Sequence, residues 1–357
     1  MRQEEDSTQG LWQRHALDPP RAYGAPVGVG VLRRYPEDFQ VEEDLGFSPA
    51  GTGHHLLLRV RKRDANTQWV ARELARACPC RPFDVGYAGL KDRHAVAVQW
   101  FTVPRSGRSP ESWVCLQGEG FEVLEAHVHT RKLPRGALAG NRFAIRIRDV
   151  SLSEEALTER AQRIARLGIP NYFGPQRFGR AGANLQRIQT PLRELQPAER
   201  GFVLSAARSL IFNAVLGARV ADGTWARVEA GDLAGLDGRA SFFEVTTMDA
   251  VLAERCERLD IHPTGPMWGG GEPRTHGRIA ELERNVATAL APAAQLAVAA
   301  GLTQERRSLR VAVRDLQCSR EGGDLWLRFR VGRGSFATSV LRELFRFDAQ
   351  GGTPPEE

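Results

Sequence analysis

Residues 86–95 read Gly86-Tyr87-Ala88-Gly89-Leu90-Lys91-Asp92-Arg93-His94-Ala95, which places one carboxylate between two cations on a glycine-bearing segment. The flanking residues 82–87 and 95–103 have the composition that is typical of strands. Lys91, Asp92 and Arg93 are therefore expected where a sheet turns over. This placement would leave Asp92 accessible, and the neighbouring positive charges would favour its carboxylate form.

An accessible carboxylate can act as a nucleophile or as a general base, so residues 86–95 are a candidate active site. An aspartate in a turn more commonly hydrogen-bonds its own backbone or caps the next element. The spacing of these residues alone leaves both interpretations open, with the structural one more frequent.

Four further stretches of the chain combine charged, aromatic and glycine residues in a similar way. They are Pro36-Glu37-Asp38-Phe39-Gln40-Val41-Glu42-Glu43, Gly140-Asn141-Arg142-Phe143, residues 171–179 (Asn-Tyr-Phe-Gly-Pro-Gln-Arg-Phe-Gly) and residues 334–344 (Gly-Ser-Phe-Ala-Thr-Ser-Val-Leu-Arg-Glu-Leu). Together with residues 86–95 and Gln99 they resemble, in order, the motifs of the TruD family of tRNA pseudouridine synthases. The resemblance covers nearly the whole chain except its two ends.

The length of 357 residues favours two domains. Strand-like runs cover residues 28–43, 54–63, 82–87, 95–103, 121–130, 142–150, 308–315 and 324–333. Helical patterns follow a predicted N-cap at Asn66 and a predicted capping box at Ser151 and Glu154. Between residues 168 and 307 the pattern changes to helices and loops, including the apolar run 202–220, and strands resume only afterwards.

This order predicts an α+β fold in which both ends of the chain form one domain and the middle forms another. The resemblance implies the same division. It consists of a mixed-sheet pseudouridine synthase catalytic domain (residues 1–167 and 308–357) interrupted by an inserted, largely helical α/β domain of TRUD type (168–307). Residues 1 to about 25 and the residues after Asp348 are polar and are expected to be frayed. Alternation predicts that Phe143, Ile145 and Ile147 point inward and that Arg146 and Arg148 face water.

Composition favours a basic, reduced, cytoplasmic protein. The formal charge is +6, and all but three of the 49 basic residues are arginine, which suits phosphate and base contacts but also follows from codon bias. Five cysteines, an odd number without repeated spacing, argue against a disulfide framework. The chain lacks an apolar signal core and an apolar run of eighteen residues, so a membrane location is not expected.

The resemblance implies a role for particular residues. Asp92 matches the essential aspartate of the family, and Phe143 matches a ring that stacks on the target base. Asn141 would offer an amide to the uracil edge or to the catalytic loop. The cation paired with the aspartate, usually lysine in the family, aligns with Arg33, while Arg34 and Lys91 remain alternatives.

Further RNA contacts are predicted at both ends of the inserted segment. Arg177 and Phe178 lie in a run of aromatic, arginine and glycine residues that suits stacking on bases, although a packed loop or hinge explains it equally well. Arg342 belongs to a helix that would face the site. The partner implied is tRNA, with uridine 13 of the D-arm as the target; no metal, cofactor or protein partner is implied, and a monomer is expected.

The implied reaction converts uridine to pseudouridine by breaking the N1–C1′ bond, turning the base, and joining C5 to C1′. Asp92 could attack C1′, remove the C2′ proton or attack C6, and the sequence does not choose between these routes. The target base must leave its stack to be reached.

Two rival functions fit the sequence less well. A zinc deaminase needs His-x-Glu and Pro-Cys-x-x-Cys, which Cys78-Pro79-Cys80 and His94-Ala95-Val96 do not supply. An RNA-binding protein that keeps the scaffold without catalysis would have no need of the Asp92 carboxylate.

Overall fold

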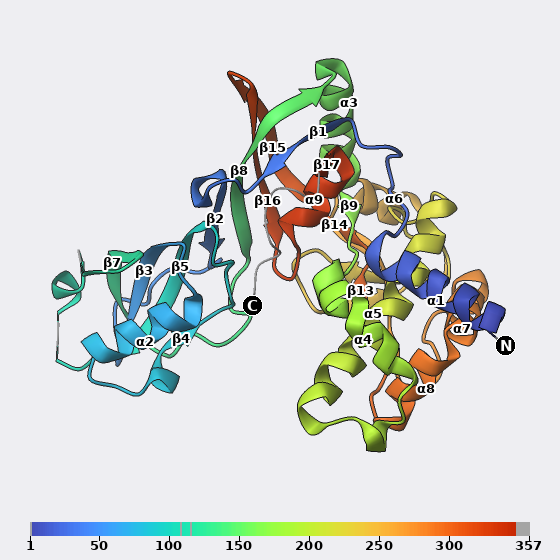
Figure 1. Ribbon diagram of the computed structural model, residues 1–357, viewed down its shortest axis with the longest axis horizontal. Helices are drawn as coiled ribbons and strands as arrows, with labels where there is room; N and C mark the ends of the chain where they lie inside the picture. The colour runs from blue at the N-terminus through green and yellow to red at the C-terminus, as the bar shows by residue number, and fades with distance from the viewer. Residues whose placement is uncertain (1, 108, 115, 348–357) are drawn as a thin grey trace. The chain divides into compact units, whose positions relative to one another are not determined.

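The structure is a computed structural model that describes residues 2–107, 109–114 and 116–347. It divides into two compact units (Figure 1), and each is described by itself. Unit 1 contains Met1–Ala25, Gln162–Ala312 and Thr338–Glu343, and unit 2 contains Pro26–Ala161, Val313–Ala337 and Leu344–Glu357. The domain boundaries predicted from the sequence remain a prediction. The expected fraying after residue 348 falls outside the described residues.

Unit 2 is built on one mixed sheet in the order β15-β16-β8-β2-β5-β3-β7-β6, with β1 beside β8 and β17, and β4 beside β5. Its strands are β1 (Gly28–Leu32), β2 (Phe39–Asp44), β3 (His55–Arg63), β4 (Gly86–Tyr87), β5 (Val96–Pro104), β6 (Gln117–Gly118), β7 (Phe121–His129), β8 (Gly140–Leu152), β15 (Val313–Glu321), β16 (Asp324–Gly332) and β17 (Phe345–Phe347). Most of these strands lie within or close to the predicted runs.

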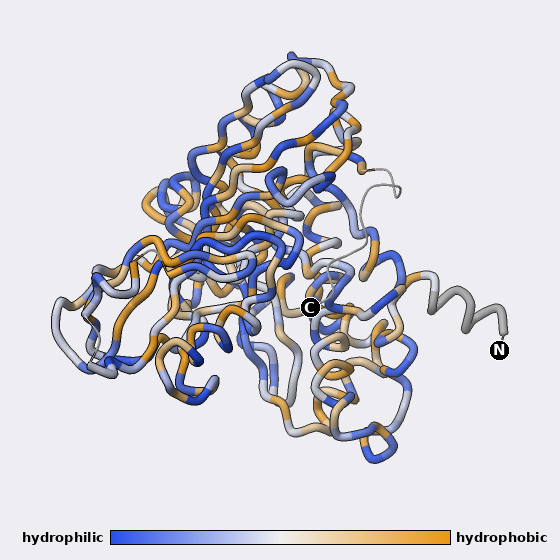
Figure 2. The backbone as a smooth tube through the Cα atoms, turned by 60° about the vertical axis from the view of Figure 1, so that its left-hand side comes forward, coloured by the Kyte–Doolittle hydropathy of each residue, from blue (hydrophilic) through white to orange (hydrophobic). Residues whose placement is uncertain are grey.

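The register of this sheet assigns its side chains to two faces, because paired residues share a face and successive residues alternate. One face, called here the loop face, carries Glu43, Lys62, Gln99, Asn141, Phe143 and Phe329. The other, called the arginine face, carries Gln40, Glu42, Arg61, Arg142, Arg328 and Arg330. The split between buried and charged side chains follows from this alternation. Apolar and polar residues likewise alternate over short distances along the backbone (Figure 2).

Helix α2 (Thr67–Ala77) covers one end of the loop face. Val70 and Leu74 pack with Leu58 and Phe101 of the sheet. The predicted N-cap position, Asn66, is confirmed. The first residue of the helix, Thr67, therefore lies at the sheet surface, where it can bond to neighbouring loops.

Two local predictions in unit 2 need correction. Arg146 and Arg148 do not simply face water, because both guanidinium groups bond to Asp324, and Arg148 also bonds to the buried Asp38. The capping box at Ser151 is wrong: Ser151 lies in β8, helix α3 begins at Glu154, and the Ser153 hydroxyl accepts from the Ala156 amide. A serine two residues later thus caps the helix.

Unit 1 is mainly helical with small sheets. Its elements are α1 (Arg2–Leu17), β9 (Ile169–Pro170), α4 (Ala183–Gln186), α5 (Pro197–Ala221), β10 (Leu233–Leu236), β11 (Phe242–Glu244), α6 (Ala250–Glu257), β12 (Ile261–Met267), α7 (Gly277–Ala289), α8 (Ala291–Ala299), β13 (Glu305–Ser308) and β14 (Arg310–Val311). The chain passes between the units within α3 (Glu154–Leu167) and α9 (Ala337–Leu344). Strands β11, β10, β12 and β13 form one sheet in that order.

The predicted fraying of residues 1–25 is wrong for residues 12–16 of α1. Trp12 and Ala16, four residues apart on one helix face, are buried, and the His15 carbonyl accepts from the Asn213 amide. Packing against α5 therefore orders this polar segment.

Helix α5 is the core of unit 1. By length and composition it would pass as a membrane span, yet 67% of its most apolar stretch is buried inside the structure. A buried core helix has the same composition as a span, so this apolar stretch is weak evidence for a membrane.

Candidate active site

Lys62 holds the segment that carries Asp92. Its ammonium group, fully buried on the loop face, donates to the carbonyl oxygens of Ala65 (2.7 Å), Asp92 (2.7 Å) and Lys91 (3.2 Å). Burial lowers the pKa of Lys62 from its ordinary 10.5 to about 8, although Asp92 opposes the shift. Three acceptors match the three N–H groups of an ammonium, so Lys62 fixes the backbone at Asp92 from the loop face of the sheet.

A second set of buried polar groups fixes the residues just before Asp92. The Lys91 ammonium pairs with the Glu43 carboxylate at 2.7 Å. The Gln99 amide donates to the Gly89 carbonyl at 2.6 Å, and the Thr67 hydroxyl, which bonds to Gln99, also accepts from the Lys91 amide at 3.0 Å. Glu43, Gln99 and Thr67 are all buried. Buried polar groups that satisfy one another specify a single loop conformation.

Arg33 pairs with Asp92. The Arg33 guanidinium donates to a carboxylate oxygen of Asp92, and the two side chains are 14% and 34% exposed, respectively. The same guanidinium lies over the Phe39 ring, 4.0 Å from its centroid. Arg33 has a φ of 58°, in the left-handed region that a side chain seldom adopts without compensation. The Asp92 carboxylate is therefore accessible on one side and held by a stacked cation on the other.

Of the three cations considered as partners of Asp92, the structure brings Arg33 to its carboxylate. Lys91 is bonded to Glu43 instead, and Arg34 pairs with Asp149 on the surface. Side chains of consecutive residues point in different directions, which explains why the sequence neighbour Lys91 does not contact the Asp92 carboxylate.

Phe143 and Asn141 lie on the same face as this pair. The Phe143 ring contacts the Phe39 ring (5.9 Å between centroids) and stacks on Phe329 (5.4 Å). Phe143 is 9% exposed, so most of its surface packs in the core. The Asn141 side-chain oxygen is buried and has no hydrogen-bond partner among the residues that the structure describes. An acceptor left in this state carries a cost that a donor from a bound molecule would remove.

The three predicted RNA contacts, Arg177, Phe178 and Arg342, lie in unit 1. Phe178 is fully buried, so it is a core residue rather than a surface for stacking. The Arg342 guanidinium bonds to the Pro19 carbonyl and to Asp18 at 3.2 Å, and is largely occupied by these structural contacts. Arg177 is exposed and donates to the Ser205 hydroxyl. Arg177 alone of these three presents an accessible cation.

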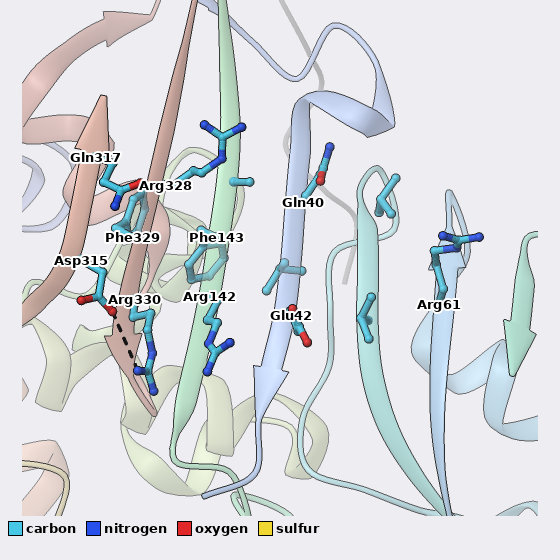
Figure 3. A pocket seen from close by; sticks show the side chains of 14 residues that line it. Gln40, Glu42, Arg61, Arg142, Phe143, Asp315, Gln317, Arg328, Phe329 and Arg330 are labelled. Carbon is cyan, nitrogen blue, oxygen red and sulfur yellow. Dashed lines mark ion pairs between the residues drawn. The ribbon is translucent and has the colours of Figure 1, made fainter. Parts of the chain in front are cut away.

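A pocket of about 670 Å³ opens on the arginine face of unit 2 (Figure 3). Arg330 pairs with Asp44 at 2.5 Å, and Arg142 lies 3.9 Å from the same carboxylate. Most of its lining belongs to the arginine face, on the opposite side of the sheet from Lys62, although Phe143 and Phe329 of the loop face also contribute to the lining. The volume of the pocket alone therefore does not locate the candidate site.

Within the described residues, no three His, Cys, Asp or Glu side chains gather in a way that could hold a metal ion. Cys78, Cys80, Cys256 and Cys318 are free thiols, while Cys115 lies outside the described residues.

Comparison with known proteins gives the family. The family model "tRNA pseudouridine synthase D (TruD)" matches residues 22–188 and 183–344. The chain belongs to this family. A tRNA pseudouridine synthase D of Methylococcus capsulatus is 44% identical over 339 residues, with 94% of this chain and 96% of that protein covered. One of Nitrosococcus oceani is also 44% identical, over 342 residues, with 93% and 96% covered.

A solved structure supports the fold of this TruD family member. The crystal structure of a putative tRNA pseudouridine synthase D from Methanosarcina mazei superimposes with a TM-score of 0.74 at 21% identity, covering 94% of this chain and 97% of that one. The α+β fold class and the resemblance found in the sequence are thus confirmed.

Sequence reasoning missed Lys62, Glu43 and Thr67 as parts of the site. One signal was available for Lys62, because a chain that uses arginine at nearly every basic position retains lysine at only three, two of which, Lys62 and Lys91, hold this loop. A planar guanidinium cannot replace an ammonium that converges on three carbonyls.

Proposed function

We propose that this protein is a tRNA pseudouridine synthase that isomerises uridine 13 in the D-arm of tRNA, with Asp92 as the catalytic carboxylate. The observation that carries the proposal is the set of contacts that hold the backbone and the carboxylate of Asp92. Its backbone is fixed by Lys62 and its carboxylate by Arg33, yet 34% of the side chain stays exposed. A purely structural aspartate needs no such accessible face. Family membership supports the same reaction.

The neighbouring residues have complementary roles in this proposal. Arg33 orients the carboxylate, and Asn141, whose buried oxygen lacks a partner among the described residues, accepts the N3–H of the flipped uracil. Phe143, which packs between Phe39 and Phe329 and is 9% exposed, supplies the aromatic contact beside the base. A flipped base needs both an aromatic contact and polar groups at its edge.

The reaction balances without a redox step or an added atom. The N1–C1′ bond breaks, the uracil turns, C5 bonds to C1′, the C5 proton leaves to solvent, and N1 takes up a proton. Asp92 serves by attack on C1′, by removal of the C2′ proton or by attack on C6, since each route needs one accessible carboxylate.

The test is tritium release from tRNA transcribed with C5-tritiated uridine. Because C5 exchanges its hydrogen for C1′, we expect close to one tritium released per tRNA, and none from a transcript in which uridine 13 is replaced by cytidine. Equal release from both transcripts would contradict the position. Binding without release from any tRNA would indicate an RNA-binding protein instead.

Arg33 gives a second prediction for this reaction. Arg33→Met keeps an unbranched apolar stem, although a shorter one, and removes the guanidinium that holds the carboxylate, so kcat for tritium release should fall on the order of 100-fold. Arg33→Lys keeps the charge and loses only the planar stack over Phe39, so its kcat should fall by about 10-fold or less. The matched control is Arg34→Met, since Arg34 pairs with Asp149 at the surface and should leave kcat unchanged. Equal activity of Arg33→Met and Arg34→Met would refute the role of Arg33.

A further inference from the structure

An exposed aromatic ring with two neighbouring cations lies before β4 and includes none of the residues assigned to the reaction. Phe83 is 66% exposed, although a large apolar ring usually gains free energy from burial. The Arg81 guanidinium lies 4.7 Å and the Lys132 ammonium 4.9 Å from the ring centroid. The Lys132 ammonium also donates to the Phe83 carbonyl. The ring is therefore held in a defined place at the surface.

A pocket of about 520 Å³ adjoins this ring. Its lining includes Phe83, Tyr87, Lys132 and Arg135, and the Arg135 guanidinium stacks 3.6 Å from the centroid of the Tyr87 ring. The wall is closely packed at Gly86, where a Cβ would lie 2.7 Å from the Leu133 carbonyl oxygen. This packing leaves no room for a side chain at position 86.

The charge around the pocket is positive. Asp84 is the nearby carboxylate, and it is bonded to Arg81 at 3.1 Å, which lowers the pKa of Asp84. Within the part of the chain that the structure describes, Lys132 and Arg135 have no carboxylate at ion-pair distance. The pocket of the arginine face differs, because its Arg142 and Arg330 approach Asp44. The Lys132 charge also lowers the pKa of Asp84, so it is partly offset at longer range. An exposed ring beside cations that form no ion pair among the described residues suits a base and its phosphates.

We propose that Phe83, Lys132 and Arg135 form a second RNA contact, which takes one unpaired nucleotide of the tRNA other than the target uridine. The base stacks on the Phe83 ring, and the adjacent phosphates bind the Lys132 ammonium and the Arg135 guanidinium. This inference rests on the proposed function, since it assumes tRNA as the substrate. It adds a binding site that contributes affinity and register but takes no part in the chemistry.

Phe83→Ala tests the stacking contact. Loss of one stacked base should weaken tRNA binding by about 10-fold and raise KM for tritium release, with kcat at saturating tRNA unchanged. Phe83→Trp keeps a stacking surface and should restore native affinity. Phe202→Ala is the matched control, because Phe202 is 67% exposed and has no cation over its ring among the described residues. Folding should not change, since Phe83 is mostly in water, and thermal melts would verify this.

Arg135→Gln tests a phosphate contact independently of the ring, whereas Lys132→Gln removes a phosphate contact together with the donor to the Phe83 carbonyl. Each should weaken tRNA binding and reduce the slope of log Kd against log salt by roughly one unit. Native affinity and salt slope in these variants, or native affinity in Phe83→Ala, would overturn the proposal. A weakened Phe83→Trp would overturn the stacking role. If the native chain fails to release tritium from tRNA, the proposed function is wrong. If the native chain releases tritium normally and these variants bind tRNA as tightly as it does, only the second RNA contact is wrong.

Discussion

Asp92→Asn is expected to abolish tritium release while leaving tRNA binding intact. The amide is neither a nucleophile nor a base, so kcat should fall by roughly four orders of magnitude. Binding should persist because phosphate contacts supply most of the affinity, and the substitution removes a negative charge that faces a polyanion. Single-turnover tritium release and filter binding with the same tRNA measure the two effects separately.

A carboxylate beside the same loop provides the control. Asp64 lies 3.6 Å from the His94 ring and 3.9 Å from Arg93, is half exposed, and has a φ of 48° that asparagine adopts equally well. Because Asp64 raises the pKa of Lys62, the comparison is made at a pH well below that pKa, where Asp64→Asn should retain native turnover. If Asp92→Asn kept turnover within a factor of a few, or if Asp64→Asn lost as much, Asp92 would not be the catalytic carboxylate.

Much of unit 2 could be predicted from its alternation. The run from Phe143 to Ile147 shows period two, and the structure buries Phe143, Ile145 and Ile147 on one face of β8. Alternation does not say what the opposite face contacts, so it predicts that Arg148 faces water, although the Arg148 guanidinium bonds to the buried Asp38. Its partner is 110 residues away in sequence.

The parts of the site that sequence could not supply depend on tertiary contacts. The Lys62 ammonium reaches the Asp92 carbonyl across 30 residues, and Glu43 bonds to Lys91 on a distant loop. No local pattern encodes these distances. Phe178 is a residue for which the local pattern misleads. Its glycine and arginine neighbours are typical of an RNA-binding loop, yet its ring is fully buried. The pattern of residue types along the sequence shows which side chains are present, whereas burial decides which of them can contact RNA.

Lys62→Met is expected to lower kcat by about 100-fold, because the backbone carbonyls of Lys91 and Asp92 lose their buried donor and the carboxylate shifts from its reactive position. Lys62→Arg should fare no better, since a planar guanidinium does not converge on three carbonyls. Arg61→Met, the adjacent position on the opposite face of β3, should keep native kcat. Native activity in Lys62→Met would show that the loop is held without it. Tritium release at saturating tRNA measures all three variants.

The lowered pKa of Lys62 makes this role testable by pH. Above about pH 8 the neutral amine offers two N–H groups to three carbonyls, so kcat of the native chain should fall, and Lys62→Met should lack that fall. The effect on global stability has the opposite sign. Because the pKa in the folded state, about 8, lies below the ordinary 10.5, the folded chain binds fewer protons between these values, and the unfolding free energy of the native chain rises relative to Lys62→Met by up to about 3 kcal/mol. If kcat of the native chain falls with pH while its unfolding free energy rises relative to Lys62→Met, the loop contact is lost without general unfolding. If kcat and this relative unfolding free energy fall together, Lys62 is not the positioning group.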